Sequence, residues 1–258
     1  VADIKGVGPE IWNDWKGSLI SELYLKTLKV LTMGKLQSNV LEGPKNLKEL
    51  LEKHLNKIGW KEKANKEYCD KFYSNYWEIF NLSTIIQHSA IFYKMKKETK
   101  NFTIHLFAES QFEASELLVI APDHHGLFSL ISGLVASSGY DVVNAKIITR
   151  SDGYALDTFF IQNKEKKPVT EEHLKKRLIK IMFKGLEGKY NIEEALNTRW
   201  EETPARFRAV KAPARVIIDN KTSDNYTIIE VNCKNAPGVL YRITKIIANL
   251  GLQINSAS

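Results

Sequence analysis

The sequence Ala121-Pro122-Asp123-His124-His125-Gly126-Leu127-Phe128 joins an apolar run to an amphipathic one. The preceding run, residues 117–121, is short and continuously apolar, which is typical of a buried strand. The following run, residues 127–138, has the apolar spacing of a helix, and Gly139 after it suits a helix end. The segment therefore predicts a strand, a tight glycine-containing turn and a helix.

The same unit occurs again 112 residues further along the chain, where Gly238 corresponds to Gly126 (238 − 126 = 112). The second turn has the sequence Asn235-Ala236-Pro237-Gly238-Val239, and an apolar helix pattern follows it. At this offset identical residues coincide at Ile131 and Ile243, Ala136 and Ala248, Gly139 and Gly251, and Ala145 and Ala257. An internal repeat indicates a tandem of structural modules. We expect small βα modules, the second of which stops before its sheet closes.

The N-terminal part of the chain has helical periodicity. Two tryptophans and two leucines at helical spacing predict a helix over residues 9–31, and a leucine stripe predicts another over residues 47–58. An aromatic cluster with interleaved lysines, residues 61–81, could stack on nucleic acid. We favour a small core, which is the commoner role of such a cluster. Ser83 is the expected N-cap of a further helix, and the charged residues 94–100 are expected to form a domain boundary.

From Asn101 onward the periodicity changes to the alternation that is typical of strands. The predicted elements are strands over residues 102–106, 117–121, 142–148, 154–161 and 215–219, and helices over residues 127–138 and from residue 171. Residues 189–213 are expected to be a basic linker punctuated by prolines. From residue 117 the order is β-α-β-β-α-β, a ferredoxin-like unit, with residues 215–219 as its last strand. A second, truncated unit supplies a strand over 226–233, a helix over 239–250 and the start of a strand at Leu252. The predicted fold class is α+β, with an all-helical N-terminal segment.

Composition and charge restrict the possible partners. No apolar run approaches the ~18 residues that a membrane span needs, and no secretory signal opens the chain. The two cysteines, Cys69 and Cys233, lack partners at metal-ligand spacing, which fits a reduced cytoplasmic compartment. The net charge is +7, but the lysines are scattered among acids, so we expect neither a membrane nor a nucleic-acid partner. Because the chain starts with Val1, we expect it to be part of something longer or the product of a broken gene.

The sequence contains none of the common catalytic signatures. It has no phosphate-binding loop, no GxGxxG or GxSxG motif, no Asp-x-Asp pair to hold magnesium and no His-Asp dipeptide. Asp123, His124 and His125 are adjacent in the sequence, but no second cluster of metal-ligating residues accompanies them, so we expect no metal there. These absences point away from a catalytic chain and toward a binding role.

The first turn has the chemistry of a binding site for an amino acid. A helix N-terminus suits a carboxylate, Gly126 allows the backbone to approach a ligand closely, and Asp123 can accept a hydrogen bond from an ammonium group. The alternative is a plain capping turn in which Asp123 is the N-cap. The residue types alone favour neither interpretation.

Three segments together resemble an ACT domain, a small-molecule regulatory module: Asp123-His124-His125-Gly126-Leu127-Phe128, Asn144-Ala145-Lys146-Ile147 and Asp152-Gly153-Tyr154-Ala155-Leu156-Asp157. Over its whole length the sequence is similar to the C-terminal part of the bifunctional uridylyltransferase/uridylyl-removing enzymes that modify the PII nitrogen-signalling protein. The further segments that carry this similarity are Trp12-Asn13-Asp14-Trp15-Lys16-Gly17, Arg215 to Asn220 and Pro237-Gly238-Val239-Leu240-Tyr241-Arg242.

In that family an N-terminal domain adds UMP to PII, a central HD domain removes it, and two C-terminal ACT domains sense glutamine. The resemblance implies that residues 1–98 are the end of the HD-type region with a linker, residues 99–220 the first ACT domain, and residues 221–258 the incomplete start of the second. Both active sites, and the Mg²⁺ that the family uses, would lie upstream. We therefore expect no catalytic residue and no cofactor in this chain.

The family turn usually has the sequence Asp-x-Pro-Gly. His125 replaces the proline in the first copy, and Asn235 replaces the acid in the second. The residues that the resemblance assigns to amino-acid binding are Asp123, His124, His125, Gly126, Leu127, Asn144, Asn235, Ala236, Pro237, Gly238, Val239 and Asn255.

The resemblance predicts a regulatory fragment that senses glutamine and controls the uridylylation of PII, its partner through the parent enzyme. One alternative is a free-standing ACT module that regulates another enzyme. Another is a non-functional remnant of a split gene. ACT modules often pair side by side, so a dimer through these modules is also expected.

Overall fold

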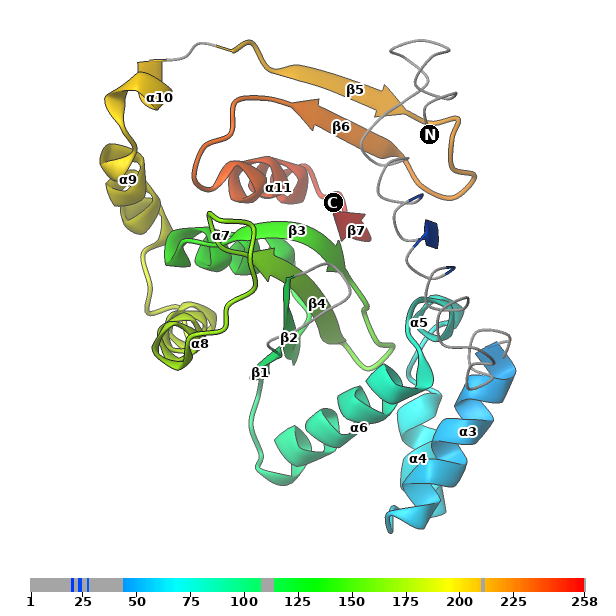
Figure 1. Ribbon diagram of the computed structural model, residues 1–258. Coiled ribbons are helices and arrows are strands. Elements are labelled where there is room, and N and C mark those ends of the chain that lie inside the picture. The colour runs from blue at the N-terminus through cyan, green and yellow to red at the C-terminus, as the bar shows by residue number, and fades with distance from the viewer. Residues whose placement is uncertain are drawn as a thin grey trace.

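The computed structural model describes residues 44–107, 114–209 and 212–257, together with residues 20, 23, 24 and 27. It is an α+β fold in which a helical N-terminal part is followed by an antiparallel sheet with further helices, which confirms the predicted fold class. Figure 1 shows helices α3 to α6 at one end of the molecule and α7, α8 and α11 beyond the sheet. The helix predicted over residues 9–31 lies almost wholly outside the described residues.

Four helices form the described part of the N-terminal segment: α3 (Pro44–Lys57), α4 (Glu62–Cys69), α5 (Ser74–Ile79) and α6 (Leu82–Lys97). The cap of α6 is Asn81, whose side chain accepts a hydrogen bond from the Thr84 amide at 3.0 Å. The prediction that Ser83 is this cap was wrong. Ser83 instead donates its hydroxyl to the Asn81 side chain at 2.6 Å, because an asparagine one residue before the helix fits the cap position better.

Most aromatic residues of this segment form a core, as favoured from the sequence, while Tyr73 is exposed. Tyr76 is fully buried, and Tyr68, Phe72, Trp77 and Phe80 are each less than a tenth exposed. The Phe72 and Tyr76 rings stack with centroids 3.8 Å apart. Because their faces are covered by one another, these rings are not available to stack on nucleic acid bases.

The central sheet has five strands in the order β1-β2-β4-β3-β7, and each pair of neighbours is antiparallel. Its strands are β1 (Thr103–Phe107), β2 (Ser115–Pro122), β3 (Asp141–Lys146), β4 (Tyr154–Gln162) and β7 (Ser256–Ala257). Between them lie α7 (Leu127–Ser138), with the predicted bounds, and α8 (Glu172–Leu186). The continuously apolar sequence of β2 is explained by burial on both faces of the sheet.

Alternate residues of β2 contribute to two different cores. Leu117 and Val119 lie in the core shared with α7 and α8, whereas Leu118 and Ile120 lie in the core shared with the N-terminal helices. The sheet is therefore a layer between the two groups of helices, and the helical segment is packed on it directly. The side-chain alternation of a strand makes this arrangement possible.

The strand predicted at residues 215–219 forms, as β5 (Arg215–Asp219), but it does not complete the first sheet. It pairs with β6 (Ile228–Asn232) in a separate two-stranded sheet. The prediction was wrong because β2 already has two neighbours, β1 and β4, so the position of a fourth ferredoxin-like strand is taken by β1.

The pairing of β5 with β6 repeats the pairing of β1 with β2. Thr103 faces Ile120 in the first pair, and Arg215 faces Asn232 in the second, which is the same register displaced by 112 residues. Strand β5 is therefore the first strand of the second unit. The repeat thus extends beyond the turn and helix to a β-β-α-β order in each copy.

The region predicted as a linker, residues 189–213, contains two helices: α9 (Ile192–Glu202) and α10 (Ala205–Ala209). Helix α9 begins at Asn191, whose side chain accepts from the Glu194 amide at 3.2 Å. Ile192 and Leu196 of α9 are buried in the core below α7. The helix forms because a cap, two acids in the first turn and one apolar stripe outweigh the flanking prolines.

The two units pack side by side around an approximate two-fold axis. Helix α11 (Val239–Asn249) lies against α7, and β7 adds to the edge of β3 (Figure 1). Ala145 faces Ala257, and Ser129 donates its hydroxyl to the Tyr241 carbonyl at 3.3 Å. Each of these contacts joins a residue to its own counterpart 112 positions away, which is the signature of a two-fold relation.

Candidate functional site

The first turn places a glycine at the N-cap of α7. Gly126 has φ 86° and ψ 3°, a left-handed conformation that glycine adopts without strain. Within the described residues, no side chain caps this helix N-terminus. The alternative in which Asp123 is the N-cap is therefore wrong. The positive end of α7 comes directly after three exposed residues, Asp123, His124 and His125.

The Asp123 side chain is held by the hairpin between β3 and β4. Its carboxylate accepts a hydrogen bond from the Thr149 hydroxyl at 3.0 Å, and its backbone amide donates to the Gly153 carbonyl at 2.8 Å. Among the described residues, Thr149 is the one donor to this carboxylate, which can accept up to about four hydrogen bonds. An exposed, oriented acid thus stands next to a helix N-terminus.

A second acid, Asp157, is buried in the adjoining strand. It is only 2% exposed and accepts one hydrogen bond, from the Ile148 amide at 3.3 Å. Its pKa is raised to about 8: burial is the largest cause, the hydrogen bond from the Ile148 amide opposes the rise, and the negative charge of Asp123 adds to it. Ile148 and Thr149 are consecutive residues, so one short segment binds both acids.

The first turn also contacts the second unit. The ring Nε2 of His125 donates to the carbonyl oxygen of Ala248, near the end of α11. The Ile147 amide donates to the Asn255 carbonyl at 3.3 Å, just before β7. Asp123, His125 and Asn255 are thereby gathered in one region between the two units. Leu127 lies below them in the core.

The other predicted residues lie elsewhere. Asn144 is half-buried in β3 opposite Phe160, and in the described part it makes no hydrogen bond to either turn. The second turn repeats the first: Gly238 has φ 77° and caps α11. Of the remaining residues in that turn, Asn235 is exposed, whereas Ala236, Pro237 and Val239 are half-buried. Participation of these residues in binding stays a prediction.

The hairpin that holds Asp123 is anchored in the helical segment by Arg150. The guanidinium of Arg150 lies 4.8, 4.5 and 4.2 Å from the ring centroids of Tyr68, Phe72 and Phe92. It also forms two hydrogen bonds with Asp152, at 3.0 and 2.9 Å. The first turn is thus connected through one hairpin to the aromatic core of the N-terminal helices.

The described residues contain no group of three or more His, Cys, Asp or Glu that could hold a metal ion. The same part of the chain has no helix that is both long and apolar enough to span a membrane.

Comparison with curated proteins finds relatives along the whole chain. The bifunctional uridylyltransferase/uridylyl-removing enzyme of Rhodospirillum rubrum is 35% identical over 255 residues, which is 99% of this chain. The proteins of the same name from Gluconobacter oxydans and Azospirillum brasilense are 34% and 32% identical over 258 and 259 residues. This chain is homologous over its whole length to part of these enzymes. It spans only 27% of the length of these relatives. No family model and no solved structure matches.

The structure links two residues to the first turn that were not predicted as site residues: Thr149, which donates to the Asp123 carboxylate, and Asp157, whose pKa the Asp123 charge raises. A signal for Asp157 was present, because it is the only charged residue in the strand pattern of residues 154–161. Thr149 gave no signal, since its role depends on how the hairpin folds back toward β2.

Proposed function

We propose that this chain is a regulatory part of a uridylyltransferase/uridylyl-removing enzyme, and that it binds a free amino acid, glutamine, at its first turn. Binding would control the addition and removal of UMP on the PII protein by the parent enzyme. The proposed ACT-type modules are the two β-β-α-β units. The homology to these enzymes and the chemistry of the first turn support this function.

The open N-terminus of α7 beside an oriented, exposed Asp123 is the observation that carries the proposal. The backbone N–H groups and the helix dipole suit the ligand's carboxylate. The Asp123 carboxylate, already positioned by Thr149, suits the ammonium group. A free α-amino acid has both groups on one carbon atom, so it can satisfy both partners together.

Asp157 is mostly protonated at neutral pH, because its pKa is about 8, and its ionisation is linked to the charge at Asp123. The Asp123 and Asp157 carboxyl groups influence each other electrostatically. A ligand ammonium at Asp123 would reduce that repulsion, because an opposite charge favours the ionised form of a neighbouring acid.

Magnesium has no part in this proposal. The family resemblance places Mg²⁺ in active sites upstream, and the described residues contain no cluster fitted to hold the ion. The chain's own contribution is to bind and orient the ligand.

A free-standing amino-acid sensor is the second candidate, but the packing of the helical segment favours the regulatory part. The N-terminal helices share one core with Leu118, Ile120, Ile148 and Leu156 of the sheet region. A free-standing sensor needs no such attachment, whereas a regulatory region must be joined to what it controls.

Titration calorimetry with glutamine, and with glutamate as the control ligand, tests the proposal. We expect selective binding of glutamine and a loss of at least about tenfold in affinity for Asp123→Asn, since a charged hydrogen bond is removed. Asp224→Asn, at another exposed acid, is the matched control and should bind like the wild type. Absence of heat from glutamine in a folded sample would refute binding. Uridylylation of PII by the chain alone would refute a purely regulatory role.

A further inference from the structure

The two-fold relation of the units creates two equivalent places for a ligand. The first lies between the first turn and the end of α11, where His125 contacts Ala248. The second lies between the turn at Gly238 and the end of α7, at Gly139. In the backbone the two are closely alike: Leu127 donates to His124 at 3.1 Å, and its counterpart Val239 donates to Ala236 at 3.2 Å.

The surroundings of these two places differ, as four corresponding glycines show. A Cβ built on Gly126 or on Gly251, which border the first place, would meet no described atom within 4 Å. A Cβ on Gly238 would lie 2.5 Å from the Leu196 side chain, and one on Gly139 would lie 2.8 Å from the Arg199 guanidinium. Leu196 and Arg199 both belong to α9.

Helix α9 therefore spans the second place from one border to the other. Leu196, which is fully buried, covers the glycine of the turn, and Arg199 covers the glycine at the end of α7. Leu196 and Arg199 are three positions apart and so lie on the same helical face. One face of one helix thus occupies the second place, whereas no described atom lies beside the corresponding glycines of the first.

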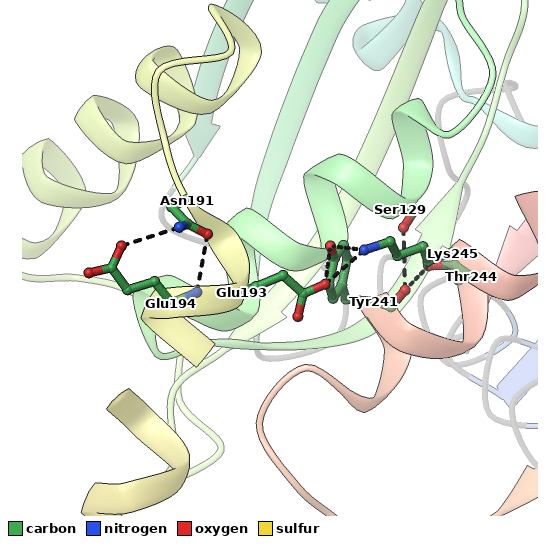
Figure 2. A network of polar contacts seen from close by, with 7 residues as sticks. All are labelled: Ser129, Asn191, Glu193, Glu194, Tyr241, Thr244 and Lys245. Carbon is green, nitrogen blue, oxygen red and sulfur yellow. Dashed lines mark hydrogen bonds and ion pairs between the residues drawn. The ribbon is translucent and has the colours of Figure 1, made fainter. Parts of the chain in front are cut away.

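A polar network fixes α9 to α11. The Tyr241 hydroxyl donates to the Glu193 carboxylate at 2.9 Å, and the Lys245 ammonium group lies 2.7 Å from the same oxygen. Figure 2 shows Tyr241 and Lys245 of α11 directed together toward Glu193 at the start of α9. Hydrogen bonds from Lys245 and Tyr241 lower the pKa of Glu193, so the carboxylate is ionised and the network stays formed at neutral pH. The helix is held over the second turn at its N-terminal end.

We propose that α9 is a built-in occupant of the second of two equivalent sites, so that the chain takes one amino acid, at the first turn. This inference rests on the proposed function for the identity of the ligand. The closure itself depends only on the contacts of α9. Leu196 takes the place of the apolar part of a ligand, and the chain thereby makes its two repeated turns unequal.

The number of glutamine molecules bound per chain tests the inference. Calorimetry should give one for the wild type and for Glu201→Ala, a change at an exposed position of the same helix, away from its cap. Leu196→Ala, which removes the covering side chain, should reveal a second binding event, and Glu193→Ala should do so more weakly. Two molecules bound by the wild type, or one by Leu196→Ala in a folded sample, would overturn the inference while leaving the proposed function intact.

A second measurement needs no ligand. Cysteines placed at the corresponding positions His124→Cys and Ala236→Cys, in a Cys233→Ser background, report the accessibility of each turn to a maleimide. Cys69 is buried and gives little background. We expect the first turn to react faster. Leu196→Ala should speed labelling at position 236 by at least about tenfold through local opening, with no change at position 124. Equal labelling of both turns in the wild type would refute closure by α9, even if glutamine does not bind.

Discussion

Replacement of Asp157 by asparagine should make the protein more stable at alkaline pH and leave it almost unchanged at acidic pH. Asp157 is buried, and among the described residues the only hydrogen bond to its side chain comes from the Ile148 amide. Asparagine has the same shape and keeps an oxygen that can accept this bond. The substitution therefore removes the titration of the group with little change in packing.

The magnitude follows from the two pKa values of the carboxyl group. In the folded protein its pKa is about 8, because burial opposes ionisation, whereas the ordinary value is 3.8. Between these values the folded protein binds one more proton than the unfolded chain. The free energy of unfolding therefore falls as pH rises, by about 1 kcal/mol for each pH unit. From pH 5 to pH 8, Asp157→Asn should gain on the order of 3 kcal/mol relative to the wild type.

Urea unfolding at pH 5, 6.5 and 8 measures this difference directly. Asp224→Asn, an exposed acid, is the matched control and should follow the wild type at all three values. Asp123→Asn should shift the pH dependence to lower pH, because the negative charge of Asp123 raises the pKa of Asp157. A stability difference between wild type and Asp157→Asn that stays constant with pH would show that Asp157 is ionised in the fold, and would refute the reasoning.

Three further predictions concern other parts of the molecule. Arg150→Met should lower the free energy of unfolding by about 2–3 kcal/mol, because it removes a buried guanidinium from three aromatic rings and leaves Asp152 without this partner. Urea unfolding measures the loss, and a change below about 0.5 kcal/mol would contradict the prediction. Gly185→Ala should lower the free energy of unfolding by about 1–3 kcal/mol, because the new Cβ would lie 2.2 Å from the Leu134 side chain. Thermal unfolding measures the loss, and an unchanged midpoint would show that the α7–α8 contact is looser than described. Glutamine binding at pH 7 should release protons, because a ligand ammonium at Asp123 lowers the pKa of Asp157. Calorimetry in buffers of different ionisation enthalpy detects this release, and identical heats in all buffers would contradict the prediction.

The repeated turn and helix could be predicted from the sequence because they depend on local signals. The helix after the first turn has the predicted bounds, residues 127–138, since glycines stand at both of its ends and its stripe is continuous. The sequence Ser151-Asp152-Gly153 between two predicted strands is likewise a local turn signal, and β3 and β4 pair on either side of it. Signals of this kind lie within a few residues of the structure that they specify.

The partner of β5 could not be predicted, because strand pairing depends on competition between distant segments. The β-α-β-β-α-β pattern offered residues 215–219 as a closing strand, but β1 occupies that edge of β2 through a much closer connection along the chain. Shorter connections are entropically less costly to close. The 112-residue offset indicates the observed pairing, because residues 103–107 and 215–219 coincide under it, so that β5 corresponds to β1.

Helix α9 was missed because prolines and basic residues around it outweighed a short apolar stripe. Its cap Asn191, with the acids Glu193 and Glu194 in the first turn, is a good local start signal. Its location over the second turn has no such local signal, because it depends on a contact between Leu196 and Gly238, which lies about forty residues later in the sequence. No local pattern specifies such a contact.

The position of the first turn is linked to the helical segment by a short chain of contacts. Asp123 is bound to Thr149 and Gly153, which border Arg150, and Arg150 is enclosed by the aromatic core of the N-terminal helices. The Ser151 amide adds a direct bond to the Lys71 carbonyl at 2.9 Å. A ligand that moves Asp123 must therefore either break these hydrogen bonds or carry the hairpin with it. Because the Arg150 side chain of this hairpin is buried among aromatic rings packed at the density of a protein interior, the second course displaces the helices as well. A regulatory region needs such a rigid connection between the group that meets the ligand and the segment that joins it to the rest of the enzyme.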